Sequence, residues 1–547
     1  MELRYYYKVN TQNRAGIARK RRVLTPKGSD GMTYKSTRGA VSGVSFSEAV
    51  LKGIAPDGGL FVPEQNVRFD SLELAEMCEM DYKTLAAHIF RQYATDFTDA
   101  EIEYCVDRAY GSGSRFDGPD PAPVTHLNGT LSVLELWHGP TAAFKDLALQ
   151  VLPAFMSVAL RKRSEQSRKI AILTATSGDT GKAALEGFRD ADGIDIMVFF
   201  PEKGVSEIQK RQMITQEGKN VRVVAVSGNF DDAQTGVKQI FGDREFGELL
   251  SEHGWQLSSA NSINFGRLLP QIVYYFHAYF ALVRSERIIM GTKVNFVVPT
   301  GNFGDILAAY YAFKAGLPVG KLLCAANSNN VVSDFLRTGF YDANREFKLT
   351  ISPAMDILIS SNLERLIYDM SGEDEKATAR NMMELARQGC YNVSRSTLAG
   401  ITSLFWSDWS SEDETRAAIA GVWKESRYLI DPHTAVGIDV YDKYVISTGD
   451  MTPTVAVATA SPFKFNRSVA ESIADANDPA LRDKLAAVNE FELLRLLSDS
   501  TGCRVPASLA TLESRPVLHN RVCATARMKE EVQNFLTGSL GSEPAAY

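Results

Sequence analysis

The stretch IAILTATSGDTGKAALEGF, from Ile170 to Phe188, decides the fold class of this chain of 547 residues. Its first half is an apolar, β-prone run, and a helix is predicted from Thr180 to Arg189. The same succession repeats in IMVFFP followed by SEIQKRQMITQEG, and in VRVVAVS followed by DDAQTGVKQIFG. Short strand-to-helix connections repeated in this way predict a parallel sheet covered by helices.

A second set of alternating elements follows downstream. It begins with the strand KVNFVVP (Lys293–Pro299), continues with a helix at Ile306–Ala315 and returns as the strand KLLCAAN. The sequence therefore predicts a second α/β unit, followed by a helical closure that contains RMKEEVQNFL. Upstream, SLELAEMCEM, YKTLAAHIFRQY and TDAEIEYCVDRAY space their apolar residues at helical intervals, which predicts a small, mostly helical N-terminal unit.

These patterns divide the chain into four predicted parts. Residues 1–31 carry eight basic residues against two acidic ones. A transit peptide, a disordered tail and a start at Met32 all remain open for this extension, and disorder is the expectation. Residues 32–125 form the N-terminal unit, residues 126–168 with 281–547 form a large α/β domain, and residues 169–280 form a small one.

Composition excludes several classes of function. The net charge of −7 and the pI near 5.7 give no electrostatic basis for binding nucleic acid or an anionic membrane. No apolar run approaches membrane-spanning length. Six cysteines without CxxC spacing indicate a reducing compartment, so a cytoplasmic location is expected. The seven histidines lack an HExxH pattern, and no metal site is predicted.

One lysine stands in an unusual setting. The stretch LELWHGPTAAFKDLALQ (Leu134–Gln150) places Lys145 among apolar residues after a Gly-Pro turn. Because desolvating an ammonium costs several kcal/mol, such a lysine either pairs with a carboxylate or stays neutral for imine chemistry. Local sequence alone favours a salt bridge, for which Asp146 or Glu135 could serve.

Two glycine-containing turns favour imine chemistry over a salt bridge for Lys145. VVPTGNFGDILAAYY (Val297–Tyr311) and TATSGDTGKAALEGF (Thr174–Phe188) both read as strand, turn and helix, a geometry that binds anions through backbone amides. Neither turn is a P-loop, and an ordinary strand–helix turn remains an alternative for each. Two anion cradles and an imine-forming lysine together fit pyridoxal phosphate and an anionic substrate.

The motifs HGPTAAFKD, TSGDTG, TGNFGD, SPAMDILISSNLERL, DPHTAVG and ATASPFKF occur in this order. In this set the chain resembles the threonine synthases of the fungal and enterobacterial type, from Tyr34 to near its C-terminus. TSGDTG alone is shared with other fold-type II pyridoxal enzymes, whereas the complete set is specific. The resemblance implies a fold-type II, tryptophan synthase β-like architecture with two parallel-sheet domains and the small N-terminal unit.

The resemblance also implies roles for individual residues. Lys145 would form the Schiff base with the cofactor, and Thr459 would face the pyridine nitrogen. The cofactor phosphate would be held by Gly301, Asn302, Phe303, Gly304 and Asp305. The substrate anions would be bound by Ser177, Gly178, Asp179, Thr180, Asn264 and Arg267.

Other positions keep two interpretations. Asn261 is a further candidate for substrate or ring contacts, and Arg267 could instead form a helix-surface salt bridge. A structural polar network is an alternative for Asn362, Glu364 and Arg365, and a helix cap is an alternative for His433. The chain departs from the family pattern at Ser461, at Phe265–Gly266 and at Lys182, which could be exposed or could add a phosphate contact.

The resemblance implies a carbon–oxygen lyase that converts O-phospho-L-homoserine and water to L-threonine and phosphate. Two alternatives stay open: a phospholyase that yields a 2-keto acid, and a cofactor-binding homologue without turnover. The expected partner is a small-molecule substrate, with a monomer favoured over a dimer.

Overall fold

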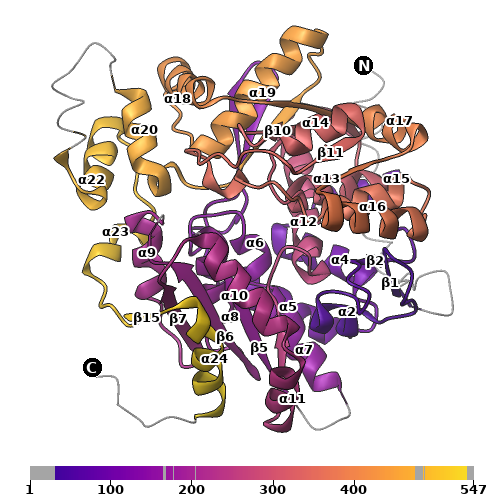
Figure 1. Ribbon diagram of the computed structural model, residues 1–547. Coiled ribbons are helices and arrows are strands. Elements are labelled where there is room, and N and C mark those ends of the chain that lie inside the picture. The colour runs from indigo at the N-terminus through magenta and orange to yellow at the C-terminus, as the bar shows by residue number, and fades with distance from the viewer. Residues whose placement is uncertain are drawn as a thin grey trace, which may run out of the picture.

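The computed structural model describes residues 31–163, 168–176, 178–203, 205–474, 485 and 487–538. The predicted disorder of the N-terminal extension falls, apart from Gly31, outside the described residues. Two separate, mainly parallel sheets form the body of the described chain, with the smaller one in the lower half of Figure 1. The predicted α/β architecture is therefore confirmed.

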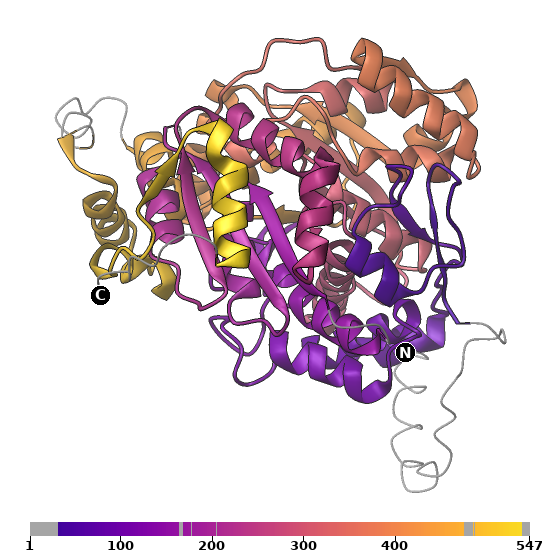
Figure 2. The ribbon, with the colours of Figure 1, turned by 60° about the horizontal axis from the view of Figure 1, so that its bottom comes forward.

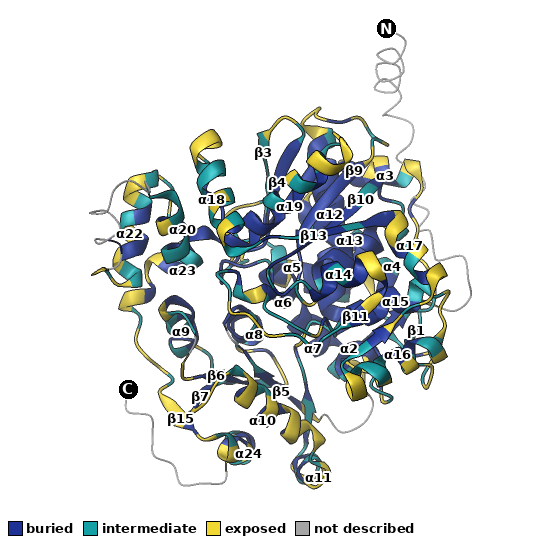
Figure 3. Ribbon diagram, turned by 45° about the horizontal axis from the view of Figure 1, so that its top comes forward, coloured by how far each residue is buried: buried dark blue, intermediate teal, exposed yellow. Residues whose placement is uncertain are grey.

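The larger sheet has six strands in the order β13-β10-β9-β14-β4-β3, and only β3 is antiparallel to its neighbour. All six residues of β9 are buried, because helices cover the central strands on both faces. These strands appear dark blue in Figure 3. Their bounds are β3 (Val124–Asn128), β4 (Leu131–Glu135), β9 (Val294–Pro299), β10 (Val319–Ala326), β13 (Phe405–Trp409) and β14 (Thr454–Ala458).

Around this sheet the chain forms helices and two short strands that pair antiparallel with each other. These are α6 (Asp146–Leu149), α7 (Leu152–Lys162), α12 (Phe265–Arg284), α13 (Gly304–Lys314), α14 (Val331–Thr338), β11 (Phe340–Asp342), α15 (Leu363–Met370), α16 (Glu375–Gln388), β12 (Cys390–Asn392), α17 (Arg395–Leu404), α18 (Glu412–Ser426) and α19 (Pro432–Thr448).

The smaller sheet is parallel throughout, in the order β15-β7-β6-β5-β8. The strand and helix predicted around Ile170–Phe188 are β5 and α8, one residue earlier than expected at each end of the helix. The elements are β5 (Lys169–Ala175), α8 (Asp179–Phe188), β6 (Ile194–Pro201), α9 (Glu207–Ile214), β7 (Val221–Val226), α10 (Phe230–Gly242), α11 (Arg244–Glu252), β8 (Trp255–Ser258), β15 (Arg521–Cys523) and α24 (Met528–Thr537).

The N-terminal unit is mostly helical, as predicted, and its helices begin at side-chain caps. Asp81 and Thr98 accept backbone hydrogen bonds at the starts of α4 and α5, which satisfies amides that a helix leaves unpaired. The unit comprises β1 (Tyr34–Ser36), α2 (Phe46–Lys52), β2 (Phe61–Pro63), α3 (Ser71–Cys78), α4 (Tyr82–Tyr93) and α5 (Asp99–Tyr110).

Two segments lie elsewhere than the predicted domain division expects. The C-terminal strand β15 pairs with β7, Cys523 opposite Val226, so the end of the chain joins the smaller sheet rather than the large domain. Figure 2 shows α24 in yellow beside the strands of that sheet. In addition, α12 packs against α13 and α4 rather than within the small unit. Sequence periodicity does not report such pairings, because strand partners far apart along the chain are chosen by packing.

After β14 the chain continues in short helices and 3₁₀ turns, the last of which follows β15. These are the 3₁₀ turn η2 (Pro462–Phe465), α20 (Asn466–Ile473), α22 (Glu490–Thr501), α23 (Ala507–Ala510) and the 3₁₀ turns η3 (Leu512–Ser514) and η4 (Thr525–Arg527). In the part of the chain that the structure describes, no helix has the length and apolar character needed to cross a membrane.

Candidate active site

The loop that carries Lys145 is fastened to the end of strand β14. The Phe144 amide donates to the Thr459 carbonyl over 2.8 Å, and the Ser461 amide donates to the Ala142 carbonyl over 3.1 Å. Lys145 itself immediately precedes the short helix α6. The two hydrogen bonds bring the backbone of Thr459 next to the loop of Lys145, although 314 residues separate them in the sequence.

The carboxylate nearest to Lys145 is Asp179, with 3.6 Å between Lys145 Nζ and Asp179 Oδ2. Neither carboxylate expected from the local sequence serves. Asp146 instead accepts hydrogen bonds from the amide and the hydroxyl of Thr141, both over 2.8 Å. Glu135 accepts from Thr125 and Tyr428 and pairs with His138. The expectation of a partner on the same loop was therefore wrong.

The ammonium of Lys145 is destabilised by its surroundings. Burial lowers its pKa, the charge of Asp179 raises it, and the positive charges of Lys464 and Arg267 lower it further. The net effect is a lowered pKa, which favours the neutral, nucleophilic amine that imine chemistry requires.

Lys464 is a site residue that the sequence interpretation missed. Its side chain is fully buried, and its Nζ lies 2.5 Å from Asp179 Oδ1 and donates to the Thr141 carbonyl over 3.0 Å. Asp179 thus faces two lysines, and their charges hold its pKa well below the usual range despite burial. The signal was present in the motif ATASPFKF, where Lys464 stands among apolar residues as Lys145 does.

The first cradle, at Gly301–Asp305, has backbone amides available for an anion. Phe303 adopts the left-handed conformation with φ 62°, and α13 begins at Gly304 directly behind it. Among the described residues, the amides from Asn302 to Asp305 find no hydrogen-bond acceptor. The carbonyls of the turn are braced from outside by Ser360 and Asn362. Free amides at a helix N-terminus fit a phosphate group.

The side chain of Asp305 takes no part in that cradle. Its Oδ1 accepts hydrogen bonds from the hydroxyls of Tyr274 and Tyr275, while its buried Oδ2 has no partner among the described residues. Burial raises the pKa of Asp305 to about 6, against the lowering effect of the two tyrosines and Lys145. Asp305 therefore offers only its backbone amide to a phosphate.

The second cradle is held by Thr176. Its hydroxyl accepts hydrogen bonds from the amides of Gly178 and Gly181, at 3.0 and 2.9 Å. Gly178 has φ 155°, and a Cβ there would lie 2.5 Å from the Gln209 side chain. Thr180 is half-buried, with no side-chain hydrogen bond to the described residues, whereas Ser177 lies outside them. Asp179 is engaged with the two lysines.

The two candidates on α12 differ in what they can still bind. Asn264 is occupied: its amide nitrogen donates to the Val50 carbonyl, and its amide oxygen caps α12 through the Gly266 amide. Arg267 is buried and donates to the Ala260 carbonyl over 2.8 Å, but its Nε has no partner in the described chain. Burial without a carboxylate lowers its pKa to about 10, so the alternative of a surface salt bridge is wrong.

The remaining candidates form structural contacts. Arg365 donates to Asn362 and to the carbonyls of Phe61 and Ile263, and Glu364 accepts both guanidinium hydrogen bonds of Arg38. This confirms the interpretation as a polar network, one that joins the N-terminal unit to the first cradle.

The ring of His433 lies between Asp431 and the Ala354 amide in the first turn of α19. Asn261 accepts from Thr174.

The three departures from the family pattern have local explanations. The Ser461 hydroxyl caps the turn η2 by accepting the Phe463 amide. Phe265 packs edge-on against Tyr34, with 5.0 Å between the ring centroids. Lys182 is buried rather than exposed, and it pairs with Glu186 over 3.1 Å. None of the three disturbs Lys145 or a cradle.

These residues fit pyridoxal phosphate. The site offers a buried lysine with a lowered pKa, a row of free backbone amides and the Arg267 Nε, which has no hydrogen-bond partner among the described residues. In the described chain no group of three or more His, Cys, Asp or Glu side chains could hold a metal ion.

Comparison with known proteins gives the same assignment. Residues 33–110 match the family model "Threonine synthase N terminus", residues 120–405 match "Pyridoxal-phosphate dependent enzyme", and residues 434–493 match "Threonine synthase, C-terminal". A threonine synthase of Pseudomonas aeruginosa is 41% identical over 84% of this chain and 94% of its own length. The human threonine synthase-like 1 protein is 38% identical over 92% of this chain and 66% of its own.

A solved structure supports the fold as a whole. The crystal structure of PLP-bound threonine synthase from Brucella melitensis has a TM-score of 0.80 and 36% sequence identity, covering 92% of this chain and 99% of that one. The matched families span all three units described above. The chain belongs to the threonine synthase family of fold-type II, pyridoxal-phosphate-dependent enzymes.

Proposed function

We propose that this protein is a threonine synthase that converts O-phospho-L-homoserine and water to L-threonine and phosphate. The observation that carries the proposal is the buried Lys145, whose pKa is lowered, between two turns suited to anions. The name of the P. aeruginosa relative states the same activity for that protein.

Pyridoxal phosphate supplies the electron sink that makes the substrate carbons acidic. In the proposal the amides of Asn302–Asp305 would hold its phosphate, and the hydroxyl of Thr459 would face its pyridine nitrogen. Unlike a carboxylate, a hydroxyl there would not keep the nitrogen protonated, which would limit how far electrons move into the ring. The Nζ of Lys145, once its amine is free, takes and returns protons at the α, β and γ carbons.

Anion binding would be shared between Arg267 and the turn at Gly178–Thr180. The guanidinium of Arg267 has no carboxylate partner, and its Nε has no hydrogen-bond partner, among the described residues. It suits a carboxylate or a phosphate, because its planar donors can bind two oxygens at once. Cationic and amide donors stabilise the charge that builds on the phosphate as it leaves. Closure of the smaller α/β unit would then exclude water until it adds at the β carbon.

Product analysis separates this reaction from its alternatives. The purified holoenzyme is incubated with O-phospho-L-homoserine, and phosphate, threonine and 2-keto acid are measured. Equal amounts of threonine and phosphate support the proposal. Phosphate with a keto acid would identify a phospholyase, and an intact cofactor absorbance without any product would identify a non-catalytic homologue.

Light scattering of the same sample tests the proposed monomer, and cell fractionation tests the proposed cytoplasmic location.

A further inference from the structure

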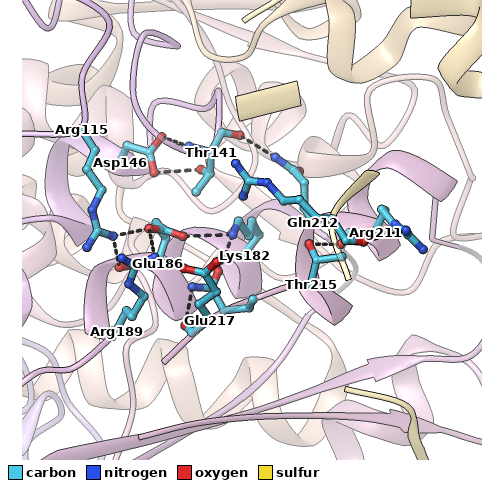
Figure 4. A network of polar contacts seen from close by, with 12 residues as sticks. Arg115, Thr141, Asp146, Lys182, Glu186, Arg189, Arg211, Gln212, Thr215 and Glu217 are labelled. Atoms are coloured by element: carbon cyan, nitrogen blue, oxygen red, sulfur yellow. Dashed lines mark hydrogen bonds and ion pairs between the residues drawn. The ribbon is translucent and has the colours of Figure 1, made fainter. Parts of the chain in front are cut away.

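A cavity of about 420 Å³ lies at the far end of α8 from Lys145. Its walls come from the linker at Arg115, the turn at Gly139–Pro140, the end of α8 and the segment that ends at Arg515. Figure 4 shows Arg115 and Arg189 directed at Glu186, with Lys182 on its other side. This cavity is separate from both cradles.

Two of the three arginines that line the cavity are paired with carboxylates. Glu186 is buried and is shared by Lys182, Arg115 and Arg189, the last over 3.7 Å. These cations lower the pKa of Glu186 to about 2 despite its burial. Two exposed acids also pair with Arg189: Glu217, which is 70% exposed, over 3.2 Å, and Asp190 over 3.9 Å.

Arg515 adds a guanidinium to this wall with no carboxylate partner among the described residues. Its one side-chain hydrogen bond goes to the Thr511 hydroxyl over 3.3 Å. It lies close enough to Lys182 to lower the pKa of that ammonium. Arg515 is thus the arginine of this wall that no carboxylate pairs in the described chain, and the remaining acid of the wall, Asp117, is exposed.

The wall that carries Arg515 is held in place before any ligand arrives. The guanidinium of Arg211, on α9, donates to the carbonyls of Leu512, Glu513 and Arg515. Holding the backbone of Arg515 in advance lowers the entropy lost when its side chain binds a ligand. An arginine without a carboxylate partner, next to other arginines, is a suitable receptor for a phosphate group, which binds guanidinium in a bidentate manner.

We propose that this cavity is a second ligand site, which binds a small phosphorylated metabolite through Arg515, Arg115 and Arg189. Its volume exceeds that of a phosphate ion alone, so the ligand carries a short organic body as well. Glu186 lies seven residues, or about two turns, beyond Asp179 on the same helix. The ligand therefore sits on the helix whose first residue pairs with Lys145 and Lys464.

Calorimetric titration of the holoenzyme with glycerol 3-phosphate tests the proposal. We expect saturable binding by wild type at millimolar concentrations, and at least about tenfold weaker binding by Arg515→Gln. Arg495→Gln serves as the matched control, because Arg495 lies in the same C-terminal region, is 60% exposed and pairs only with Glu513 among the described residues. This control should bind as wild type does.

Two results would overturn the site. One is the absence of binding by wild type at about 10 mM glycerol 3-phosphate. The other is equal binding by wild type and Arg515→Gln, which would place the ligand in the active-site cradles instead. Should Arg515→Gln fail to fold, Arg115→Gln replaces it, since Arg115 is 41% exposed and its loss removes no core packing. The expected weakening is the same.

Discussion

At the scale of single residues, the site depends on one carboxylate between two buried lysines. Asp179 lies 2.5 Å from Lys464 and 3.6 Å from Lys145, so the shorter ion pair leaves Lys145 the less stabilised of the two. An ammonium that is buried and incompletely paired gives up its proton more readily. Lys464 thus helps to keep Lys145 reactive by holding Asp179.

Replacing Lys145 by alanine is expected to remove activity and leave the fold near intact. Threonine formation should fall by about a thousandfold or more, because proton transfer at the substrate carbons loses its base. The melting temperature should stay close to that of wild type, since Lys464 still neutralises Asp179. Threonine release, cofactor absorbance and thermal melting measure the outcome. A variant that keeps the wild-type absorbance band would refute the role of Lys145.

Asp146 should make stability depend on pH. Burial raises its pKa from 3.8 to about 7, although the hydrogen bonds from Thr141 favour the charged form. Between pH 3.8 and about 7, the folded state therefore binds the carboxyl proton of Asp146 more tightly than the unfolded state does. The stabilising contribution is complete below pH 3.8 and is lost as the pH rises towards 7.

The comparison uses Asp146→Asn, whose side chain does not titrate. From about pH 4 to 7 the stability of wild type relative to this variant should fall, as measured by chemical denaturation at each pH. A constant difference across that range would show that Asp146 stays ionised when folded.

At the scale of elements, three helices differ in whether the backbone amides at their first turn are free to bind an anion. The turn before α13 and the turn before α8 leave amides for anions, whereas the start of α12 is closed by its own cap, Asn264. The glycines of the first cradle also differ. A Cβ at Gly301 would lie 2.9 Å from the Ala354 carbonyl, whereas a Cβ at Gly304 would lie 3.4 Å from Asn362, an ordinary contact.

Gly304→Val is therefore expected to fold and to lose cofactor, since its side chain fills the approach of a phosphate to the turn. Thr180→Ala should keep the cofactor and raise KM or lower kcat, because the turn at Gly178–Thr180 is proposed to bind substrate. Cofactor absorbance and steady-state kinetics of both variants decide the matter. If Thr180→Ala loses the cofactor and Gly304→Val does not, the two cradles have the opposite roles.

Asn264→Ala tests whether that side chain serves the fold or the substrate. Loss of the cap should lower the free energy of unfolding by about 1 kcal/mol, with kcat and KM near those of wild type. Thermal melting and kinetics measure both quantities. A large rise in KM with unchanged stability would instead restore Asn264 as a substrate ligand.

At the scale of the whole molecule, the end of the chain returns to complete the smaller sheet. Strand β15 extends that sheet, and α24 buries Met528 and Val532 against it. The Trp255 indole also donates to the Leu536 carbonyl over 3.0 Å. The unit proposed to move during catalysis is thereby completed by the C-terminal segment of the chain.

Val532→Ala should destabilise the protein by about 2 kcal/mol, because it removes buried methyl groups and leaves a cavity under α24. Gln533→Ala, on the same helix and half-buried, is the matched control and should change stability by less than about 0.5 kcal/mol. Denaturant unfolding measures both. Equal stability of the two variants would mean that α24 contributes little to the smaller unit.

The sequence by itself determined the elements and the chemistry that individual motifs can perform. Apolar periodicity located β5, α8 and α24 within a residue or two, because local backbone preference and a buried face both follow from neighbouring residues. The turn GNFGD likewise owes its shape to its own glycines and to the helix that begins directly behind it. The resemblance then supplied the cofactor and the substrate.

Only the tertiary structure decided which groups meet. Asp179, rather than Asp146 or Glu135, became the partner of Lys145, and Lys464 joined them from more than 280 residues farther along the chain. The strand β15 likewise reached β7 across the whole second half of the chain. Such pairings depend on how sheets and helices pack, and burial sets their energy. A residue's neighbours in sequence do not carry that information.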